Sequence, residues 1–465
     1  MDHRTDKKMT DSGVDWIGEL PEGWKMSPLK KAASIHLGKM LTPHQTNQKQ
    51  REVSYLRAAN ITGSSEDRST MWATEAEIRK NSVADNDVLV VEGGSVGFAI
   101  QIDNPLQDLI IQNSVHRIRF HENQRFGFWW MIFLYGSDVY AQLINSVSIA
   151  HLTKEKLGDI PMACPPLPLQ QAIANYLDRH VGLIDEEREL ISKKIKLLKE
   201  QRSALIFEVV TGKRTLVEAQ HLAGVEDWSD IIGSGPMVAV PTSRADDPFV
   251  KSGRLVDSGV EWIGEMPDGW ETTHLKDVAV LHVGKTPSTG VPDNFDGGIP
   301  WITIADLNDR GFFPATTKKT ISLTGVASCG IRKAKKGSLL VSFKLSIGKV
   351  AIAKDNVYTN EAVAAVNASK RCLNKFLLWA LPVSMMNEAT ENIYGAKIYN
   401  QDQLGRATIP LPSLDNQQAI AEFLDQETGL IDEEIDLLSV KSGLLSEKRK
   451  TLIFEAVTGK IEING

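Results

Sequence analysis

The residue types that carry out reactions are present in this sequence, but they do not stand at the spacings that catalysis needs. Gly284-Lys285-Thr286 has the form of the end of a phosphate-binding loop. That motif requires a glycine five residues before Gly284, and the chain has Ala279 there. Neither H-E-x-x-H nor G-x-S-x-G occurs, and no carboxylates and lysines are grouped as in a nuclease. We therefore expect no catalytic residue in this chain.

Metal and cofactor sites are not indicated either. Cys164, Cys329 and Cys372 form no C-x-x-C pair and have no flanking histidines, which favours reduced thiols in a cytosolic protein. The ten histidines are spread without ligand spacing. His36 and His282 each stand two residues before a Gly-Lys pair, and a packing role and a DNA contact are both open for them. We expect no metal and no cofactor in this chain.

Basic side chains accompanied by polar and aromatic residues point instead to DNA. Lysine and arginine pair with phosphates, while amide, hydroxyl and imidazole groups hydrogen-bond to base edges. The basic run Arg332–Lys336 adds a phosphate-facing surface to the second half of the chain. The candidate DNA-binding residues are Lys39, Arg57, Asn60, Ser95, His151 and Lys154 in the first half, and Lys285, Lys344, Ser346, Tyr394, Lys397, Tyr399 and Asn400 in the second.

The distribution of charge along the chain is compatible with DNA binding. The 465 residues carry a formal net charge of −7, which argues against binding nucleic acid by bulk positive charge. Residues 271–409, however, hold 17 basic and 11 acidic side chains, and residues 25–160 hold 15 and 14. The acidic excess lies in the N-terminal segment, in residues 214–270 and in the C-terminal segment.

An internal repeat organises the chain. Asp11–Trp24 recurs as Asp257–Trp270, and Gln170–Ala174 recurs as Gln417–Ala421. Between these matched ends the halves resemble each other only faintly, with short strand-like runs at Val88–Val91 and 339–342. We therefore predict two related mixed α/β scaffolds that carry two different surfaces.

A seven-residue apolar repeat predicts a long helix after each variable region, and two such helices in one chain can pair as an antiparallel coiled coil. Leu183, Leu190 and Leu197, with Leu430, Leu437 and Leu444, are expected to widen the apolar stripe. The coiled-coil residues are Leu177, Ile184, Ile191, Leu198 and Leu205 in the first helix, and Leu424, Ile431, Leu438, Leu445 and Leu452 in the second.

The repeated motifs are similar to those of a known family. They resemble motifs of the specificity subunit of type I restriction–modification enzymes. The matching motifs are the D-S-G-V-[DE]-W-I-G-E-x-P-x-G-W openings, the Q-Q-A-I-A helix entries and the L-I-D-E-E and L-I-F-E-x-V-T-G-K segments. The segments Trp301–Leu307 and Ser342–Gly348 also look like one recurring class of its target recognition domains. The resemblance covers nearly the whole chain.

The resemblance implies a fold and a set of partners. The fold would be α/β (α+β), with two target recognition domains joined by two long helices that form an antiparallel coiled coil. The partners would be double-stranded DNA, two methyltransferase subunits and up to two restriction subunits. S-adenosylmethionine would bind the methyltransferase partner, and ATP and Mg²⁺ the restriction partner. The expected divisions are 1–164, 165–213, 214–256 as a linker, 257–409 and 410–465.

Two other functions remain open at this point. A methyltransferase or nuclease with an unrecognised active site would methylate or cut DNA without partners. A pure assembly scaffold would lack sequence-selective DNA binding. The polar N-terminus and the absence of a long apolar run favour a cytoplasmic protein over a secreted or membrane-spanning one.

Overall fold

The computed structural model describes residues 8–463, except 67–68, 138, 141–150, 214–253, 309–316, 345 and 392–396. The chain forms two compact units. The first contains residues 1–192 and 439–465, and the second contains residues 193–438. Most of the expected linker, 214–256, lies outside the described residues.

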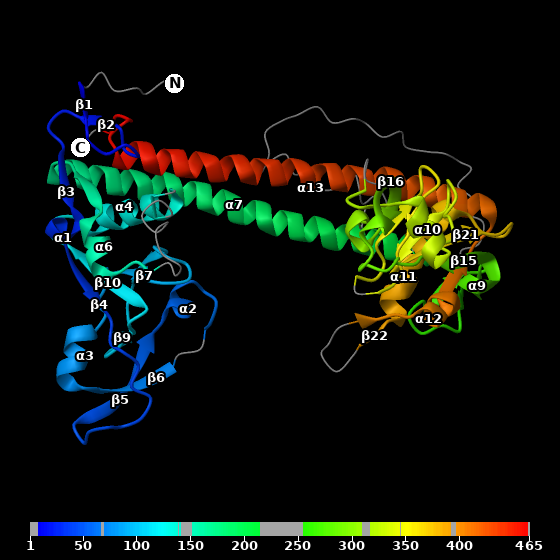
Figure 1. Cartoon of the computed structure of the whole chain (residues 1–465), viewed down its shortest axis with the longest axis horizontal. Helices are drawn as coiled ribbons and strands as arrows, with labels where there is room; N and C mark the ends of the chain where they lie inside the picture. Colours follow the sequence, from blue (N-terminus) through cyan, green and yellow to red (C-terminus); the bar gives the residue numbers. More distant parts are fainter. Residues whose placement is uncertain are drawn as a thin grey trace. The chain divides into compact units, whose positions relative to one another are not determined.

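The first unit is built on an antiparallel four-stranded sheet with the order β4-β10-β7-β8 (Figure 1). A smaller sheet, β6-β5-β9, and the two-stranded sheets β1-β2 and β3-β11 complete its strands. The strands are β1 (Met9–Asp11), β2 (Glu19–Pro21), β3 (Lys25–Pro28), β4 (Ala33–Leu37), β5 (Gln50–Leu56), β6 (Ser69–Thr74), β7 (Val88–Val91), β8 (Ala99–Gln101), β9 (Ile110–Ile111), β10 (Val115–Phe120) and β11 (Pro161–Cys164). The helices are α1 (Leu29–Ala32), α2 (Ala58–Ile61), α3 (Glu75–Asn81), α4 (Gln124–Gly136), α6 (Lys154–Asp159) and α7 (Leu167–Val210), of which α7 continues into the second unit.

The second unit repeats this topology. Its main sheet has the order β15-β21-β18-β19 and its smaller sheet the order β17-β16-β20. The strands are β12 (Leu255–Asp257), β13 (Glu265–Pro267), β14 (Glu271–His274), β15 (Ala279–Val283), β16 (Phe295–Ile302), β17 (Thr320–Ile321), β18 (Leu339–Ser342), β19 (Val350–Ile352), β20 (Tyr358–Thr359), β21 (Val363–Ala368), β22 (Thr390–Glu391), β23 (Lys397–Ile398) and β24 (Thr408–Leu411). The helices are α9 (Leu275–Val278), α10 (Leu323–Cys329), α11 (Asn374–Glu388), α12 (Gln401–Arg406) and α13 (Leu414–Val457), with 3₁₀ turns at Pro292–Asn294 and Ile304–Asp306. The prediction of two related mixed α/β scaffolds is confirmed.

Apolar runs form the core of each unit. All four residues of β7 and of β18 are buried, as expected for central strands that are covered on both faces. The aromatic helix α4 packs Trp130 and Phe126 into the first core, and α11 packs Phe376 into the second. These helices hold the main sheet of their unit against the long helices.

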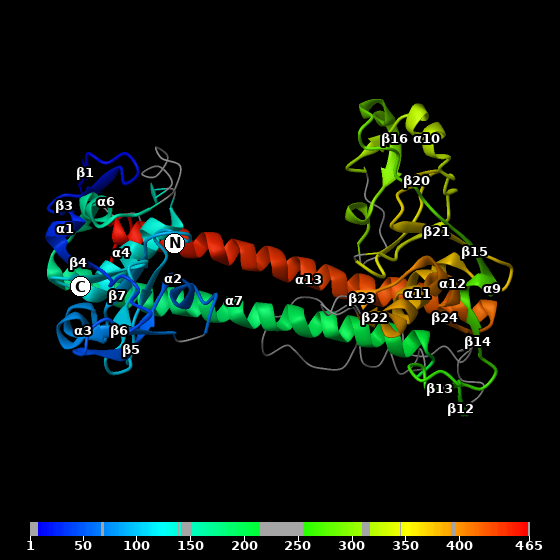
Figure 2. The ribbon, with the colours of Figure 1, turned by 60° about the horizontal axis from the view of Figure 1, so that its bottom comes forward.

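Most side chains of the seven-residue repeat are buried along the two long helices, and we call this line of residues the seam. Within each unit α7 and α13 lie side by side and run antiparallel (Figures 1 and 2). Leu177, Ile184, Ile191, Leu198 and Leu205 are buried in α7, as are Leu424, Leu438 and Leu445 in α13, while Ile431 and Leu452 are half-buried. Ion pairs also cross the seam, from Asp185 to Arg449 (2.9 Å) and Glu187 to Lys441 (2.7 Å) in the first unit, and from Lys194 to Glu434 (2.6 Å) and Arg202 to Asp432 (3.2 Å) in the second.

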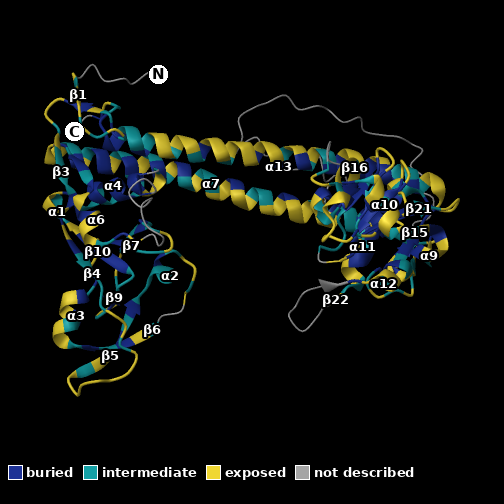
Figure 3. Ribbon diagram, viewed as in Figure 1, coloured by how far each residue is buried: buried dark blue, intermediate teal, exposed yellow. Residues whose placement is uncertain are grey.

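The expected widening of the stripe is wrong. Leu183, Leu190 and Leu197 of α7, and Leu430, Leu437 and Leu444 of α13, are 54% to 72% exposed. Each precedes a seam residue by one position, which turns its side chain about 100° away from the partner helix. Figure 3 shows the exposed residues recurring along both helices. Each helix therefore has an outward leucine stripe in addition to its buried seam.

The end of each long helix packs against the opening motif of the other repeat. After α13, Lys460 donates a hydrogen bond from Nζ to the Ile17 carbonyl oxygen (2.9 Å). Gly459 has φ of +69°, and a Cβ there would lie 2.5 Å from Pro21 Cγ, so this turn requires glycine. In the second unit Gly212 has the same φ, and a Cβ would lie 2.4 Å from Pro267 Cδ.

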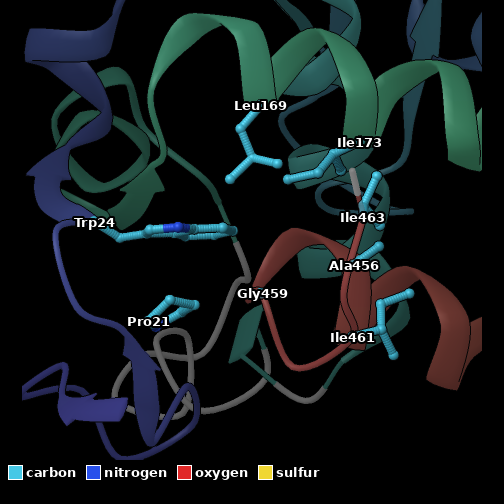
Figure 4. A pocket seen from close by; sticks show the side chains of 8 residues that line it. All are labelled: Pro21, Trp24, Leu169, Ile173, Ala456, Gly459, Ile461 and Ile463. Atoms are coloured by element: carbon cyan, nitrogen blue, oxygen red, sulfur yellow. The ribbon is translucent and has the colours of Figure 1, made fainter. Parts of the chain in front are cut away.

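A small cavity lies at the first of these two junctions. Figure 4 shows the Trp24 ring between Leu169 and Pro21, with Ala456 and Ile461 on the far wall. Its volume is about 10 Å³, which is room for no more than one water molecule. The cavity is a packing seam between chain segments and not a ligand site.

Candidate nucleic-acid interface

The loop between β7 and β8 brings together candidate residues that are distant in sequence. Gly93 forms a backbone bridge with His151, and the Leu152 amide donates to the Glu92 carbonyl oxygen (2.9 Å). The Ser95 and His151 side chains are both exposed beside this bridge. Burial raises the pKa of the Glu92 carboxyl group in the same loop, while His151 acts in the opposite direction. Lys154 follows at the start of α6 and is also exposed.

The equivalent loop of the second unit, between β18 and β19, carries positive charge. Lys344 is exposed, with its ammonium 5.7 Å from the centroid of the Phe343 ring. Ser346 is half-buried, and its carbonyl oxygen accepts a hydrogen bond from the Ser342 hydroxyl. The Lys349 amide donates to that hydroxyl (3.0 Å), so the turn is held tightly. Equivalent positions of the two sheets therefore present different chemistry, with an acidic loop in one unit and a basic loop in the other.

A second basic surface lies in the same unit. Arg332, Lys333, Lys335 and Lys336 are all exposed. Ala334 between them is buried and forms a backbone bridge with Val357, which fixes the run in place. Such a strip of cations has the chemistry of a phosphate-binding surface.

Lys39 lies inside the fold. Its side chain is only 12% exposed, and Nζ donates to Glu77 Oε1 (2.8 Å) and to Thr42 Oγ1 (3.0 Å). The hydrogen bond from Lys39 lowers the pKa of the Glu77 carboxyl group. This pairing favours a positioning role for Lys39 over direct contact with a phosphate.

Arg57 and Asn60 belong to one local turn. Asn60 Oδ1 accepts from the Arg57 amide (3.1 Å), and Asn60 Nδ2 donates to the Ser65 carbonyl oxygen (3.1 Å). The Arg57 Nε atom is buried and has no hydrogen-bond partner among the described residues. Lys285 in the other unit is exposed and donates from Nζ to the Cys329 carbonyl oxygen (2.9 Å).

Tyr399 belongs to the core, which removes it from the candidate interface. Its side chain is 3% exposed, and its hydroxyl donates to Glu388 Oε2 (3.3 Å). Burial raises the pKa of this phenol. Asn400 is exposed but caps α12, because its Oδ1 accepts from the Gln403 amide (2.9 Å). Tyr394 and the Lys397 side chain lie outside the described residues, although the Lys397 backbone belongs to β23.

The two repeated histidines stand in matching strands. His36 Nε2 lies 3.0 Å from Asn81 Oδ1, at the end of α3, and this contact favours a packing role for His36 over a DNA contact. Burial lowers the pKa of His36 and of His282. Both imidazoles are therefore neutral near pH 7.

Within the described ranges, no three His, Cys, Asp or Glu side chains are grouped closely enough to hold a metal ion. Cys164, Cys329 and Cys372 are free thiols. Among those same residues, no helix is both long enough and apolar enough to cross a membrane.

The periodicity of the sequence does not predict the outward leucine stripes. Leu183 and Ile184 are adjacent and equally apolar, so periodicity alone cannot say which of them faces the partner helix. The structure buries Ile184 and leaves Leu183 56% exposed. An exposed apolar row of this kind is a candidate surface for protein association.

Comparison with known proteins places these observations in one family. The family described as type I restriction modification DNA specificity domain matches residues 21–197 and 267–437. The two matched segments correspond to the two repeats.

Individual relatives agree with this match. The type I restriction enzyme MjaIX specificity subunit of Methanocaldococcus jannaschii is 30% identical over 174 residues, which is 37% of this chain and only 40% of that protein. The EcoBI specificity subunit of Escherichia coli is 22% identical over 439 residues, covering 91% of this chain and 83% of its own length. A solved chain from a study of complex assembly and conformational transition of the type I R-M system has a TM-score of 0.65 at 16% identity, covering 95% of this chain and 99% of that one. That last likeness concerns the fold alone.

Proposed function

Because this chain belongs to the family of type I restriction modification DNA specificity domains, we propose that it is the non-catalytic subunit that selects DNA for a restriction–modification complex. It binds an asymmetric bipartite sequence, with one half-site read by each unit. The proposed divisions are the recognition regions 1–164 and 257–409, the helical regions 165–213 and 410–465, and the linker 214–256.

One observation carries the proposal of two different half-sites. The main sheets have matching strand orders, β4-β10-β7-β8 and β15-β21-β18-β19, so equivalent loops are presented in the same way. Those loops differ in charge, with Glu92 in the first unit and Lys344 in the second. Scaffolds with matching strand orders but different loops are expected to read different bases.

The candidate contacts divide between the units. Ser95, His151 and Lys154 are exposed in the first unit, and Lys344 and Lys285 in the second. The lysines contact phosphates, and the hydroxyl and imidazole groups contact base edges. Ser346 supports the second loop, and the strip from Arg332 to Lys336 adds phosphate contacts.

The outward leucine stripes support the docking of partner subunits. A helix that exposes one leucine in each of three successive heptads suits a partner that also presents an apolar helical face. The pseudo-symmetric repeats suit two methyltransferase subunits, with up to two restriction subunits added. S-adenosylmethionine binds the methyltransferase subunits, and ATP and Mg²⁺ the restriction subunits. The complex methylates adenine N6, or cleaves unmodified DNA, in the cytoplasm.

Sequencing of methylated adenines tests this function. The full chain is expressed with its cognate methyltransferase in a host that lacks other adenine methylation. We expect one bipartite motif with two different half-sites and a fixed spacer. The methyltransferase expressed without this chain is the control, and it is expected to leave the motif unmethylated. Methylation of the same motif without this chain, or by this chain without the methyltransferase, contradicts the proposal.

A further inference from the structure

A polar loop joins β4 to β5 in the first unit. Residues Met40–Lys49 contain no Asp or Glu and are rich in amides. All ten except Thr42 are exposed, and Met40 is 73% exposed. Leu41 is 42% exposed beside it. We call this segment the amide loop. The loop leads into β5, on the side of the unit remote from α7 (Figure 1).

Internal hydrogen bonds hold the amide loop in one conformation. Gln50 Oε1 accepts from the Thr46 amide (2.8 Å), the Thr46 hydroxyl (3.1 Å) and the Asn47 amide (3.1 Å). Gln45 Nε2 donates to the Gln50 carbonyl oxygen (3.2 Å). Asn47 Oδ1 accepts from the Lys49 amide (2.8 Å). The Gln45, Asn47 and Gln50 side chains are therefore used to order the loop.

The base of the loop is fixed by Lys39. Thr42 accepts a hydrogen bond from Lys39 Nζ, and the Thr42 carbonyl oxygen accepts from the Trp72 amide (2.9 Å). The same Lys39 ammonium pairs with Glu77, at the start of α3. Lys39 thus ties the loop to α3, and Thr42 ties it to β6. A loop held in its binding conformation loses little entropy when it binds.

The ordered loop leaves a defined set of side chains facing outward. Gln48 makes no side-chain hydrogen bond within the part of the chain that is described, although its neighbours do. Met40 and Leu41 stand exposed at the start of the loop, and Lys49 at its end. A glutamine amide pairs in bidentate fashion with adenine N6 and N7, and an apolar side chain packs on the thymine methyl group. Both groups read the same base pair, A·T, in the major groove.

We propose that the amide loop reads an A·T pair of the first half-site, with Gln48 hydrogen-bonded to the adenine and Met40 and Leu41 against the thymine methyl. Lys39 is a positioning residue for this loop. The proposal rests on the DNA-specificity function argued above and adds the reading element and the base pair that it recognises.

The second unit has no counterpart of this loop. Its equivalent segment, between β15 and β16, contains Asp293 and a 3₁₀ turn at Pro292–Asn294. The Thr286 hydroxyl there donates to the Glu361 carboxylate, and Asn294 Nδ2 donates to the Ser288 carbonyl oxygen (3.0 Å). The amide loop therefore reads bases in the first half-site only.

Methylated-site sequencing of the assembled complex tests this assignment with variants of the full chain. Gln48→Ala is expected to lose roughly 10- to 100-fold of its discrimination at one A·T position of the first half-site. The spacer and the second half-site stay unchanged. Met40→Ala combined with Leu41→Ala is expected to relax the same base pair. Gln107→Ala is the matched control, because Gln107 is an exposed glutamine in another loop of the same unit.

The role of Lys39 is tested by which base pair of the half-site its substitution affects. Lys39→Met is expected to relax the same A·T pair as Gln48→Ala, and Lys39→Arg to restore it. A uniform loss across the first half-site would assign Lys39 a structural role only. If Gln48→Ala and the Met40 and Leu41 variant both keep the wild-type motif with equal preference, the amide-loop proposal alone is overturned. Absence of any bipartite motif in the wild-type complex overturns the DNA-specificity function itself, and this inference with it.

Discussion

His116 stands at the centre of the main sheet of the first unit, where a charged imidazole has no suitable surroundings. It is fully buried in β10, between β4 and β7, and Nε2 lies 2.7 Å from the Leu152 carbonyl oxygen. Burial is the largest influence on its pKa and lowers it, while the hydrogen bond to Leu152 acts in the opposite direction. The fold therefore disfavours the charged form of this imidazole.

The lowered pKa of His116 predicts a loss of stability in acid. An unfolded histidine takes up a proton near pH 6.5, whereas folded His116 does so only at lower pH. The unfolded state then binds more protons, so stability falls as the pH drops from about 7 through this range. His116→Gln keeps a donor for Leu152 and does not titrate, and it is expected to show a smaller decrease in melting temperature between pH 7.5 and 5.5. Equal decreases in the two proteins, measured by calorimetry, would contradict the prediction.

The sequence identified polar residue types at the candidate interface, but not the partners that those residues have in the fold. Lys39, Asn60 and Asn400 were predicted to bind DNA, and all three have hydrogen-bond partners within the chain. For Asn400 a signal was present, since Gln403 three residues later has the spacing of a capping box. The burial of Tyr399 depends on packing across the second unit, and no local pattern reports it.

At the level of elements, the two long helices were predicted from their seven-residue repeat, and the buried seam follows it. In each heptad an outward leucine directly precedes a seam residue, as Leu183 precedes Ile184. Which of the two faces the partner helix was not predictable, because both are apolar. The ion pairs that cross the seam were not predictable either, because they depend on the register of two segments that are more than 200 residues apart.

The ion pair between Arg202 and Asp432 gives the second prediction. Their side chains are 12% and 10% exposed, so removing one partner leaves a buried charge. Arg202→Ala is expected to lower the free energy of unfolding by about 3 kcal/mol, while Arg202→Met with Asp432→Leu recovers most of that loss. Denaturant unfolding of the full chain measures both variants.

An exposed pair on α7 provides the matched control for that experiment. Lys196 and Glu200 are 78% and 61% exposed, and Lys196→Ala is expected to change stability by less than about 0.5 kcal/mol. A loss for Arg202→Ala no larger than that for Lys196→Ala would show that the buried pair does not contribute to stability.

At the level of the whole molecule, the repeat in the sequence predicted two related units, but not how similar their folds are. The variable regions align only faintly, yet the strand orders of their main and smaller sheets match. Buried strands such as Val88–Val91 and Leu339–Ser342 accept many combinations of apolar residues of suitable volume. Sequence similarity is therefore lost faster than topology, while the exposed loops diverge in charge and length.

The helix pair leads to a prediction about the spacer between the half-sites. Each long helix is a single element of 44 residues, and under the proposed function its length sets the spacer. Deleting Glu186–Ser192 together with Ser439–Leu445 removes one heptad from each helix and keeps the seam in register. It also removes both members of the pair between Glu187 and Lys441, so no charge loses its partner there.

Seven helical residues span about 10 Å, or roughly three base pairs of DNA. The paired deletion is therefore expected to shorten the spacer by about three base pairs and to leave both half-sites unchanged, as read by sequencing of methylated adenines. Deleting only Glu186–Ser192 is the control, because it misaligns the two helices and is expected to abolish methylation. If the paired deletion leaves the spacer unchanged, the length of the helix pair does not determine where the two units bind. The two units would then read the same bases at the same separation although the helices that join them had been shortened.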